Sequence, residues 1–290
     1  MQLDIFEHSR DTMLRNDVAQ ALLRRDPAAA APALLSLRDE FAADDCLAPL
    51  ATLLAELEAP AAPGFDDHRA AQAARAGLAE RVEPAALRIF GAADAAAWTL
   101  PLWRDLARRA ARLGFDPGHA DEHAAALWLR AGDAAAAVEA CEGIGSWRRI
   151  PAPLAFMTEA RYRLHDLDGI WPLLAELAWL APRRLDALMK RLADPVLTRL
   201  RREFDAGFEG AGDAEDLAWF PAWVLTRQPA LARLIGQAEA GRHAEPEQAL
   251  RLLVEILGLE RQGRQADLVA RRRRLRDLNG ALYAAYTATR

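Results

Sequence analysis

Hydrophobic side chains recur every three or four residues along most of this 290-residue chain, with polar residues between them. That spacing places the apolar side chains on one face of an α-helix. Runs that alternate β-branched and polar residues, as strands do, are scarce. The pattern therefore predicts an all-α protein. Residues 183–200 give the clearest example, with the stripe Leu185, Leu188, Met189, Leu192, Val196 and Leu200, and Pro195 is expected to kink or split this helix.

Prolines, glycines and capping aspartates divide this pattern into separate helices. Two prolines and a glycine at 59–66 cannot continue a helix, so this segment is expected to be a linker. Residues 1–58 are then N-terminal helical hairpins and residues 67–290 a helical-repeat body, either as separate parts or as one continuous solenoid. The segments 203–216 and 240–246 are expected to be loops. The last helix is expected to run from 265 to 288. Earlier helices are expected at 11–25, 27–41, 46–57, 67–81, 84–91, 95–113, 120–131, 133–144 and 247–262.

The stretch 119–182 reads as two stacked helical hairpins. Gly132-Asp133 marks the turn of the first hairpin and Asp168 lies in the junction of the second, 35 residues later. A period of that length is typical of helical repeats. The first hairpin resembles a tetratricopeptide repeat (TPR), with an aromatic at Trp128 four residues before the turn glycine. The other matching positions are Ala125, Ala137 and Val138.

The second hairpin departs from the TPR pattern, because Leu167 replaces the turn glycine and Pro172 replaces the alanine. The resemblance is therefore specific over about one repeat. The resemblance implies stacked antiparallel hairpins that form a TPR-like α-α superhelix. It also implies a scaffold that binds other proteins, but it does not identify the partner.

Composition narrows the classes of function. The net charge of −5 argues against a dedicated nucleic-acid binder. Cys46 and Cys141 are far apart and form no CxxC, which fits a reducing compartment. The start of the chain lacks the layout of a signal peptide, and no apolar window is long enough to span a membrane. We therefore expect a cytoplasmic protein with no membrane partner.

Motifs for nucleotide binding and for nucleophilic catalysis are absent from the sequence: it contains no GxGxxG, no GxxxxGK[ST] and no GxSxG. This weakens the case for an enzyme, and no cofactor is expected. One motif keeps an enzymatic alternative open. His119, Glu122 and His123 spell HxxEH, in which two histidines four residues apart on a helix can bind one zinc ion. The competing interpretation is a helix start, where acidic residues favour the helix dipole.

A second alternative is nucleic-acid binding at the C-terminus. From Arg261 onward the chain has eight arginines against two aspartates, including the run Arg271–Arg274 and Arg276. Such a patch can bind phosphates. A solvated helix face, with arginines pairing to acids of a neighbouring helix, explains the same residues.

Tryptophan and arginine side chains are frequent at the centres of protein interfaces. Trp147 lies in a loop beside two arginines, although it could instead fill the joint between two hairpins. The leading hypothesis is a non-enzymatic helical-repeat adaptor. Its predicted partner-binding residues are Trp128, Trp147, Arg148, Arg149, Arg161 and Arg163.

Overall fold

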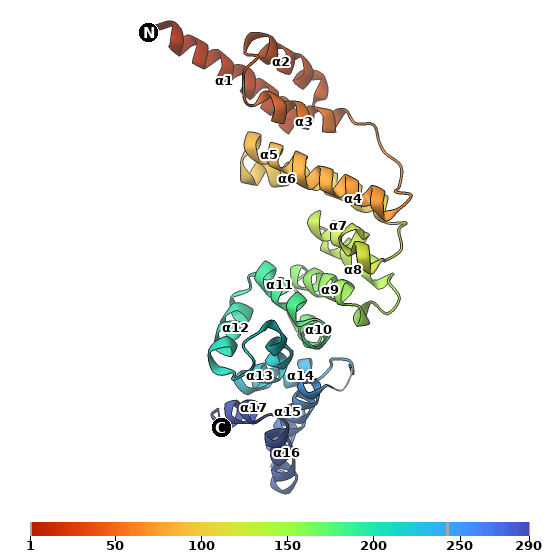
Figure 1. The fold of residues 1–290 in the computed structure, drawn as a ribbon, viewed down its shortest axis with the longest axis vertical. Coiled ribbons are helices and arrows are strands. Elements are labelled where there is room, and N and C mark those ends of the chain that lie inside the picture. Colours follow the sequence, from red (N-terminus) through yellow and green to blue (C-terminus); the bar gives the residue numbers. More distant parts are fainter. Residues whose placement is uncertain (1, 242–243, 290) are drawn as a thin grey trace. The chain divides into compact units, whose positions relative to one another are not determined.

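The computed structural model of the chain describes residues 2–241 and 244–289. Within these ranges all regular secondary structure is helical and no strand occurs, which confirms the all-α prediction (Figure 1). Part of the predicted loop 240–246 lies outside the described residues. The contacts between residues divide the chain into two compact units, 1–133 and 134–290. No helix of the described part is long and apolar enough to cross a membrane.

The helices of the first unit begin where the sequence supplies caps. Asp26 accepts a hydrogen bond from the backbone N–H of Ala29 (3.0 Å), and Asp67 accepts one from Ala70 (2.7 Å). Each bond satisfies one of the free N–H groups of a helix start. The elements are α1 (Gln2–Leu23), α2 (Pro27–Glu40), α3 (Leu47–Glu58), α4 (His68–Gly77), a π-helical turn (Leu78–Val82), α5 (Glu83–Phe90), α6 (Ala92–Ala110), a 3-10 segment (Pro117–Glu122) and α7 (Ala124–Arg130).

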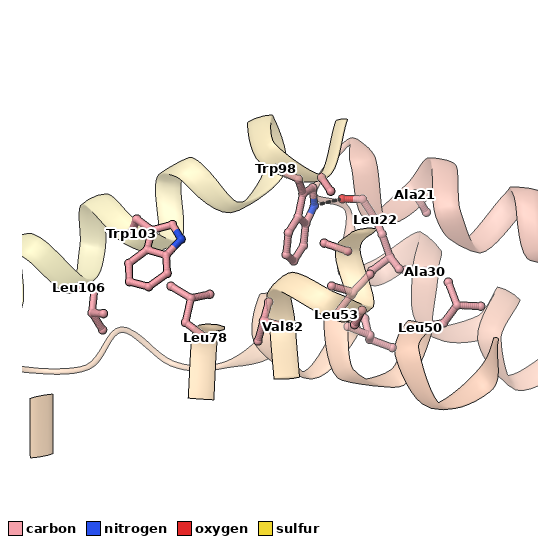
Figure 2. Close-up of a cluster of buried hydrophobic side chains, with 14 of the residues drawn as sticks. Ala21, Leu22, Ala30, Leu50, Leu53, Leu78, Val82, Trp98, Trp103 and Leu106 are labelled. Carbon is pink, nitrogen blue, oxygen red and sulfur yellow. Dashed lines mark hydrogen bonds between the residues drawn. The ribbon is translucent and has the colours of Figure 1, made fainter. Parts of the chain in front are cut away.

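One hydrophobic core joins the early and late helices of the first unit (Figure 2). Trp98 of α6 is buried in it, and its indole Nε1–H donates to the carbonyl of Leu22 at the end of α1 (2.8 Å). The guanidinium of Arg25 bonds to the Trp98 carbonyl and lies 4.9 Å from the centre of its ring. Leu53 of α3 and Val82 belong to the same core. Helices on both sides of the segment 59–66 therefore pack together.

The segment 59–66 contains no helix and is fixed against α6. The backbone N–H of Phe65 donates to the carbonyl of Arg109 (3.1 Å), and Nε of Arg109 donates to the carbonyl of Pro63 (3.0 Å). The Arg109 guanidinium also lies 4.2 Å from the centre of the Phe65 ring. The predicted division into 1–58, 59–66 and 67–290 stays a prediction about independent folding units.

The second unit begins after the turn at Gly132, whose positive φ of 74° matches the left-handed conformation expected for that glycine. The two helices of the predicted TPR-like hairpin thus lie in different units, and the hairpin stays a prediction. The elements of the second unit are α8 (Ala134–Glu142), a 3-10 turn (Trp147–Arg149), α9 (Pro151–Arg163), α10 (Leu167–Leu180), α11 (Pro182–Leu192), α12 (Pro195–Gly207), a 3-10 segment (Ala214–Trp219), α13 (Phe220–Arg227), a 3-10 turn (Pro229–Leu231), α14 (Ala232–Ile235), α15 (Glu245–Gln262), α16 (Gln265–Leu278) and α17 (Gly280–Thr287).

Consecutive helices of the second unit pack on one another, α8 on α9, α9 on α10, and both α9 and α10 on α11. Helix α13 then contacts α10, α15 and α17. Fully buried side chains hold these layers together, among them Met157 on α9, Leu177 on α10 and Trp223 on α13.

Two predicted elements of the second unit are wrong in detail. The predicted acidic loop 203–216 is helical as far as Gly207, because Phe204 is buried and holds this turn of α12 in the core. The predicted helix 265–288 is two helices, since the side chain of Asn279 accepts a hydrogen bond from Leu282 (2.7 Å) and caps α17. The break expected at Pro195 does occur between α11 and α12.

Candidate binding cavity in the second unit

The predicted partner-binding residues separate into three places. Trp147, Arg148 and Arg149 together form the 3-10 turn that precedes α9. Arg161 and Arg163 lie in the last turn of α9, at its opposite end. The sixth residue, Trp128, is half-buried on α7 and packs against the core of the first unit.

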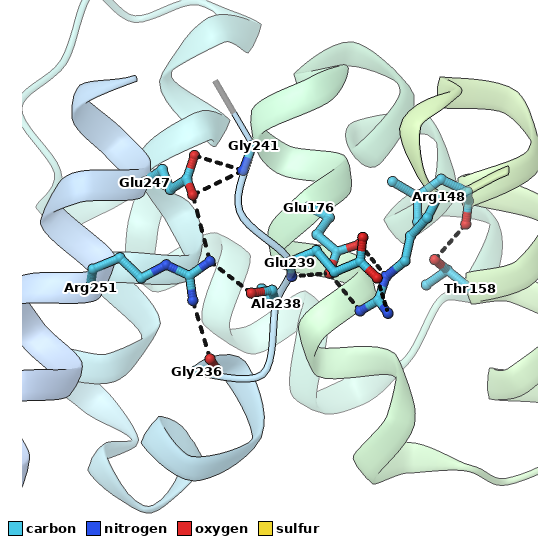
Figure 3. Close-up of polar contacts among 10 residues, drawn as sticks. Arg148, Thr158, Glu176, Gly236, Ala238, Glu239, Gly241, Glu247 and Arg251 are labelled. Carbon is cyan, nitrogen blue, oxygen red and sulfur yellow. Dashed lines mark hydrogen bonds and ion pairs between the residues drawn. The ribbon is translucent and has the colours of Figure 1, made fainter. Parts of the chain in front are cut away.

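Arg148 is held by an internal ion pair (Figure 3). Its Nε and one terminal nitrogen each donate to a carboxylate oxygen of Glu176 on α10, both at 2.7 Å. Its other terminal nitrogen donates to Glu239 at 3.0 Å. The side chain of Glu176 is 8% exposed, so this bidentate pair is nearly buried. Arg148 therefore has a structural role, and its contact with a partner stays a prediction.

The segment 236–241, which connects α14 to α15, is fixed by charged side chains (Figure 3). Glu176 accepts a hydrogen bond from the backbone N–H of Glu239 (2.7 Å), and Glu247 accepts one from Gly241 (3.0 Å). Arg251 donates to the carbonyl of Gly236 (3.1 Å) and to that of Ala238 (2.7 Å). Helices α10 and α15 thus hold this loop by its backbone.

Gly241 explains how the loop comes so close to α15. A Cβ atom at this position would lie 2.9 Å from a carboxylate oxygen of Glu247. Atoms at that separation overlap, so any larger residue would move the loop or the carboxylate. Burial raises the pKa of Glu176, and the hydrogen bonds from Arg148 and from the Glu239 backbone oppose that shift.

A cavity of about 310 Å³ lies beside this loop. The 3-10 turn before α9, the C-terminal end of α10, the loop and the start of α15 form its wall. Trp179 and Leu180 supply apolar surface, and Arg149 supplies an exposed guanidinium. Within the described residues, Arg149 forms no ion pair or hydrogen bond through its side chain. The indole Nε1 of Trp179 is buried and also has no acceptor there.

Sequence reasoning found Arg148 and Arg149 but missed Glu176, Trp179 and the loop. One signal was present: Glu176 is the single charged residue in the apolar stretch 170–180 of α10. An acid in such a position is buried, and a buried acid requires a cationic partner. The partner itself could not be named, because 28 residues separate it from Glu176.

Arg161 and Arg163 do not reach the cavity wall. Arg161 pairs with Asp166 (3.6 Å). Arg163 pairs with Glu159 (2.5 Å), which is 7% exposed and also accepts from Arg191 (3.1 Å). These arginines hold a buried carboxylate and the end of α9 in place. Because they lie outside the cavity wall, the predicted set of six residues does not form one continuous site.

The HxxEH motif does not lie on one α-helix, contrary to what the metal-hydrolase alternative requires. Residues 117–122 form a 3-10 segment, and His123 instead caps α7 by accepting the backbone N–H of Ala125 at Nδ1 (3.2 Å). The carboxylate of Glu122 pairs with Arg75 (2.8 Å). His119 stacks on His68, with ring centres 5.4 Å apart. The structure uses the motif to begin a helix.

His123 makes the first unit sensitive to acid. Burial, together with the nearby charge of His68, lowers the pKa of His123 to about 4. An unfolded histidine titrates near 6.5, so between about pH 6.5 and 4 the unfolded state binds more protons. The free energy of unfolding should therefore fall by up to about 3 kcal/mol as the pH falls through this window.

The variant His123→Asn tests this pH dependence. Asparagine keeps an acceptor at the helix cap but does not titrate. We expect urea denaturation to show a smaller loss of stability between pH 7 and pH 4.5 in the variant than in the wild type. Equal losses in both proteins would contradict the assignment.

Four of the C-terminal arginines pair with acids of the same unit. Arg271 pairs with Glu255, and Arg272 pairs with Glu260. Arg264 and Arg276 pair with the aspartates of α16 that follow them. Arg261, Arg273 and Arg274 are exposed and form no ion pair with the described residues, so phosphate binding at this end of the chain stays a prediction.

One group of residues in the described part has side chains close enough to share a metal ion. Oxygen and sulfur atoms of Asp44, Asp45 and Cys46 lie within 4.8 Å of one another. Arg15 pairs with Asp44 and Arg88 pairs with Asp45, so both carboxylates already have cationic partners. The arrangement is that of a charged turn between α2 and α3.

Comparison with known proteins gave no assignment: no protein-family model, no curated protein and no solved structure matches this chain. The resemblance to tetratricopeptide repeats therefore depends on the residues of the first hairpin alone.

Proposed function

We propose that this chain is a non-enzymatic helical-repeat protein that binds another protein, with TPR-like stacked hairpins as its scaffold. The observation that carries the proposal is Arg149, an exposed cation without an internal partner among the described residues, in the wall of a cavity that Trp179 also lines. Arginine and tryptophan are the residues most enriched where protein interfaces gain their binding energy.

The fixed loop supports this function. Arg148, Glu176, Glu247 and Arg251 hold the backbone of the loop before any ligand arrives. A wall that is already ordered loses little conformational entropy on binding, so more of the contact energy appears as affinity. Arg148 shapes the cavity, and Arg149 is the residue free to contact a partner.

Charge reversal at Arg149 tests the proposal. Tagged wild type, Arg149→Glu and Arg202→Glu would each be used to capture proteins from a nuclease-treated lysate of the native organism, with mass spectrometry as the readout. Arg202 is the matched control, an exposed arginine on α12 that lies outside the cavity. We expect Arg149→Glu to lose, by at least about tenfold, a protein that both others retain. The same proteins on all three baits would contradict the proposal.

A further inference from the structure

Among the charged side chains of the cavity wall, one has no hydrogen-bond or ion-pair partner within the described residues. Glu176 and Glu239 both accept hydrogen bonds from Arg148. Glu247 accepts the N–H of Gly241 and pairs with Arg251 (3.5 Å). Each carboxylate of the wall thus has a donor. Arg149 is the one charged residue of the wall that has no partner within the described residues.

From this imbalance we infer that the cavity binds an acidic side chain of a partner peptide, next to an apolar side chain of the same peptide. This inference rests on the proposed function, because it names the kind of segment that the partner supplies. A guanidinium and a carboxylate form two parallel charge-assisted hydrogen bonds. A cationic ligand would find no carboxylate in the wall that lacks a donor.

The apolar part of the wall is where the apolar side chain of the partner peptide would bind. Trp179, Leu180, Ala240 and Ala244 surround the cavity beside Arg149. Its volume of about 310 Å³ is at the lower end for ligand sites. The cavity therefore suits one or two side chains of an extended segment and is too small for a helix.

The carboxylate comes from a side chain and not from a peptide C-terminus. Sites that capture a terminal carboxylate use free backbone N–H groups. In the loop beside this cavity, the N–H of Glu239 already donates to Glu176, and that of Gly241 already donates to Glu247. The N–H of Ala240 lies between two engaged neighbours, so these three residues do not offer the successive free N–H groups that such a site needs. Arg149 is a side-chain donor at the exposed rim, where an acidic side chain on a flexible stem can reach it.

Short synthetic peptides test the inference directly on the full chain. The probes are N-acetylated, C-amidated tetrapeptides Gly-Glu-Leu-Gly, Gly-Gln-Leu-Gly and Gly-Lys-Leu-Gly, and the Gln peptide with a free C-terminal carboxylate. Binding is followed by the NMR signal of the Trp179 indole N–H, which is assigned with the variant Trp179→Phe. Titration extends to about 10 mM, since one small contact gives affinities in the millimolar range.

We expect the Glu peptide to bind the wild type about tenfold more tightly than the Gln peptide, and this preference to vanish in Arg149→Gln. Equal binding of the Glu and Gln peptides, stronger binding of the Lys peptide, or no binding of any peptide would overturn the inference. If the Gln peptide bound tightly only with a free C-terminus, the conclusion that the carboxylate belongs to a side chain would be wrong.

The two proposals fail separately. If the acidic peptide binds through Arg149 but the captured proteins do not depend on this residue, the cavity has the inferred ligand and the proposed function is wrong. If a captured protein depends on Arg149 while the peptides show no acidic preference, the proposed function stands and the inferred ligand is wrong.

Discussion

Replacing Trp98 by alanine should lower the free energy of unfolding of the first unit by about 3–5 kcal/mol, the usual cost of removing a buried tryptophan. The substitution leaves a cavity between α1 and α6. It also leaves the carbonyl of Leu22 without the indole donor that it now has at 2.8 Å. Because Leu22 and Leu53 lie in the same core as Trp98, the loss should spread to α1 and α3.

Hydrogen exchange of the full chain, read by mass spectrometry, would check this result. We expect peptides from residues 12–58 and 83–110 to lose protection together in Trp98→Ala. Leu87→Ala on α5 serves as the control, because Leu87 is 55% exposed and its loss should change stability by less than about 0.5 kcal/mol. If 12–58 kept their protection while 83–110 lost theirs, the two segments would not share one core.

Replacing Arg148 by alanine should lower the free energy of unfolding of the second unit by about 3–5 kcal/mol. The change leaves Glu176 buried without its bidentate partner, and removing one member of a buried pair costs more than removing both. Arg149→Ala is the natural control, since this neighbour has no internal partner among the described residues and should cost about 0.5 kcal/mol or less.

The pH dependence identifies the cause of the Arg148→Ala defect. The pKa of Glu176 is raised by burial, so the folded state holds this proton more tightly than the unfolded state does. Glu176 therefore favours folding at low pH, and this contribution is lost as the pH rises through its folded pKa. Urea denaturation should show a smaller defect at pH 4 than at pH 7. A second variant, Arg148→Met with Glu176→Leu, should recover part of the stability; no recovery would contradict the buried-charge explanation.

Local signals predicted the helices well because their causes are local. The stripe that contains Leu185 and Leu200, the turn at Gly132 and the break at Pro195 all depend on residues within a few positions of one another. The two wrong helix boundaries have other causes: a short polar residue that caps a helix, and the burial of an aromatic side chain. Asn279 ends a helix by capping the next one, and Phe204 keeps a turn helical although acids surround it.

The candidate site could be predicted only in part, because most of its contacts join distant residues. A tryptophan beside two arginines in one loop predicted a binding role for Arg148 and Arg149, and both residues line the cavity. Nothing local indicated that Glu239, 91 residues away, would meet Arg148. The HxxEH motif shows the opposite error: its spacing suits a zinc site only on an α-helix, and His123 is instead the cap at the helix start.

The hydrogen bond between Trp98 and Leu22 also affects how the chain folds during synthesis. These residues are 76 positions apart, about two repeat lengths of 35 residues. In a solenoid each repeat contacts only its neighbours, which keeps contact order low and folding fast. Here α1–α3 emerge from the ribosome first but cannot complete their core until α6 follows. The apolar face of α3 is therefore exposed to chaperones and to aggregation for longer than in a simple repeat array.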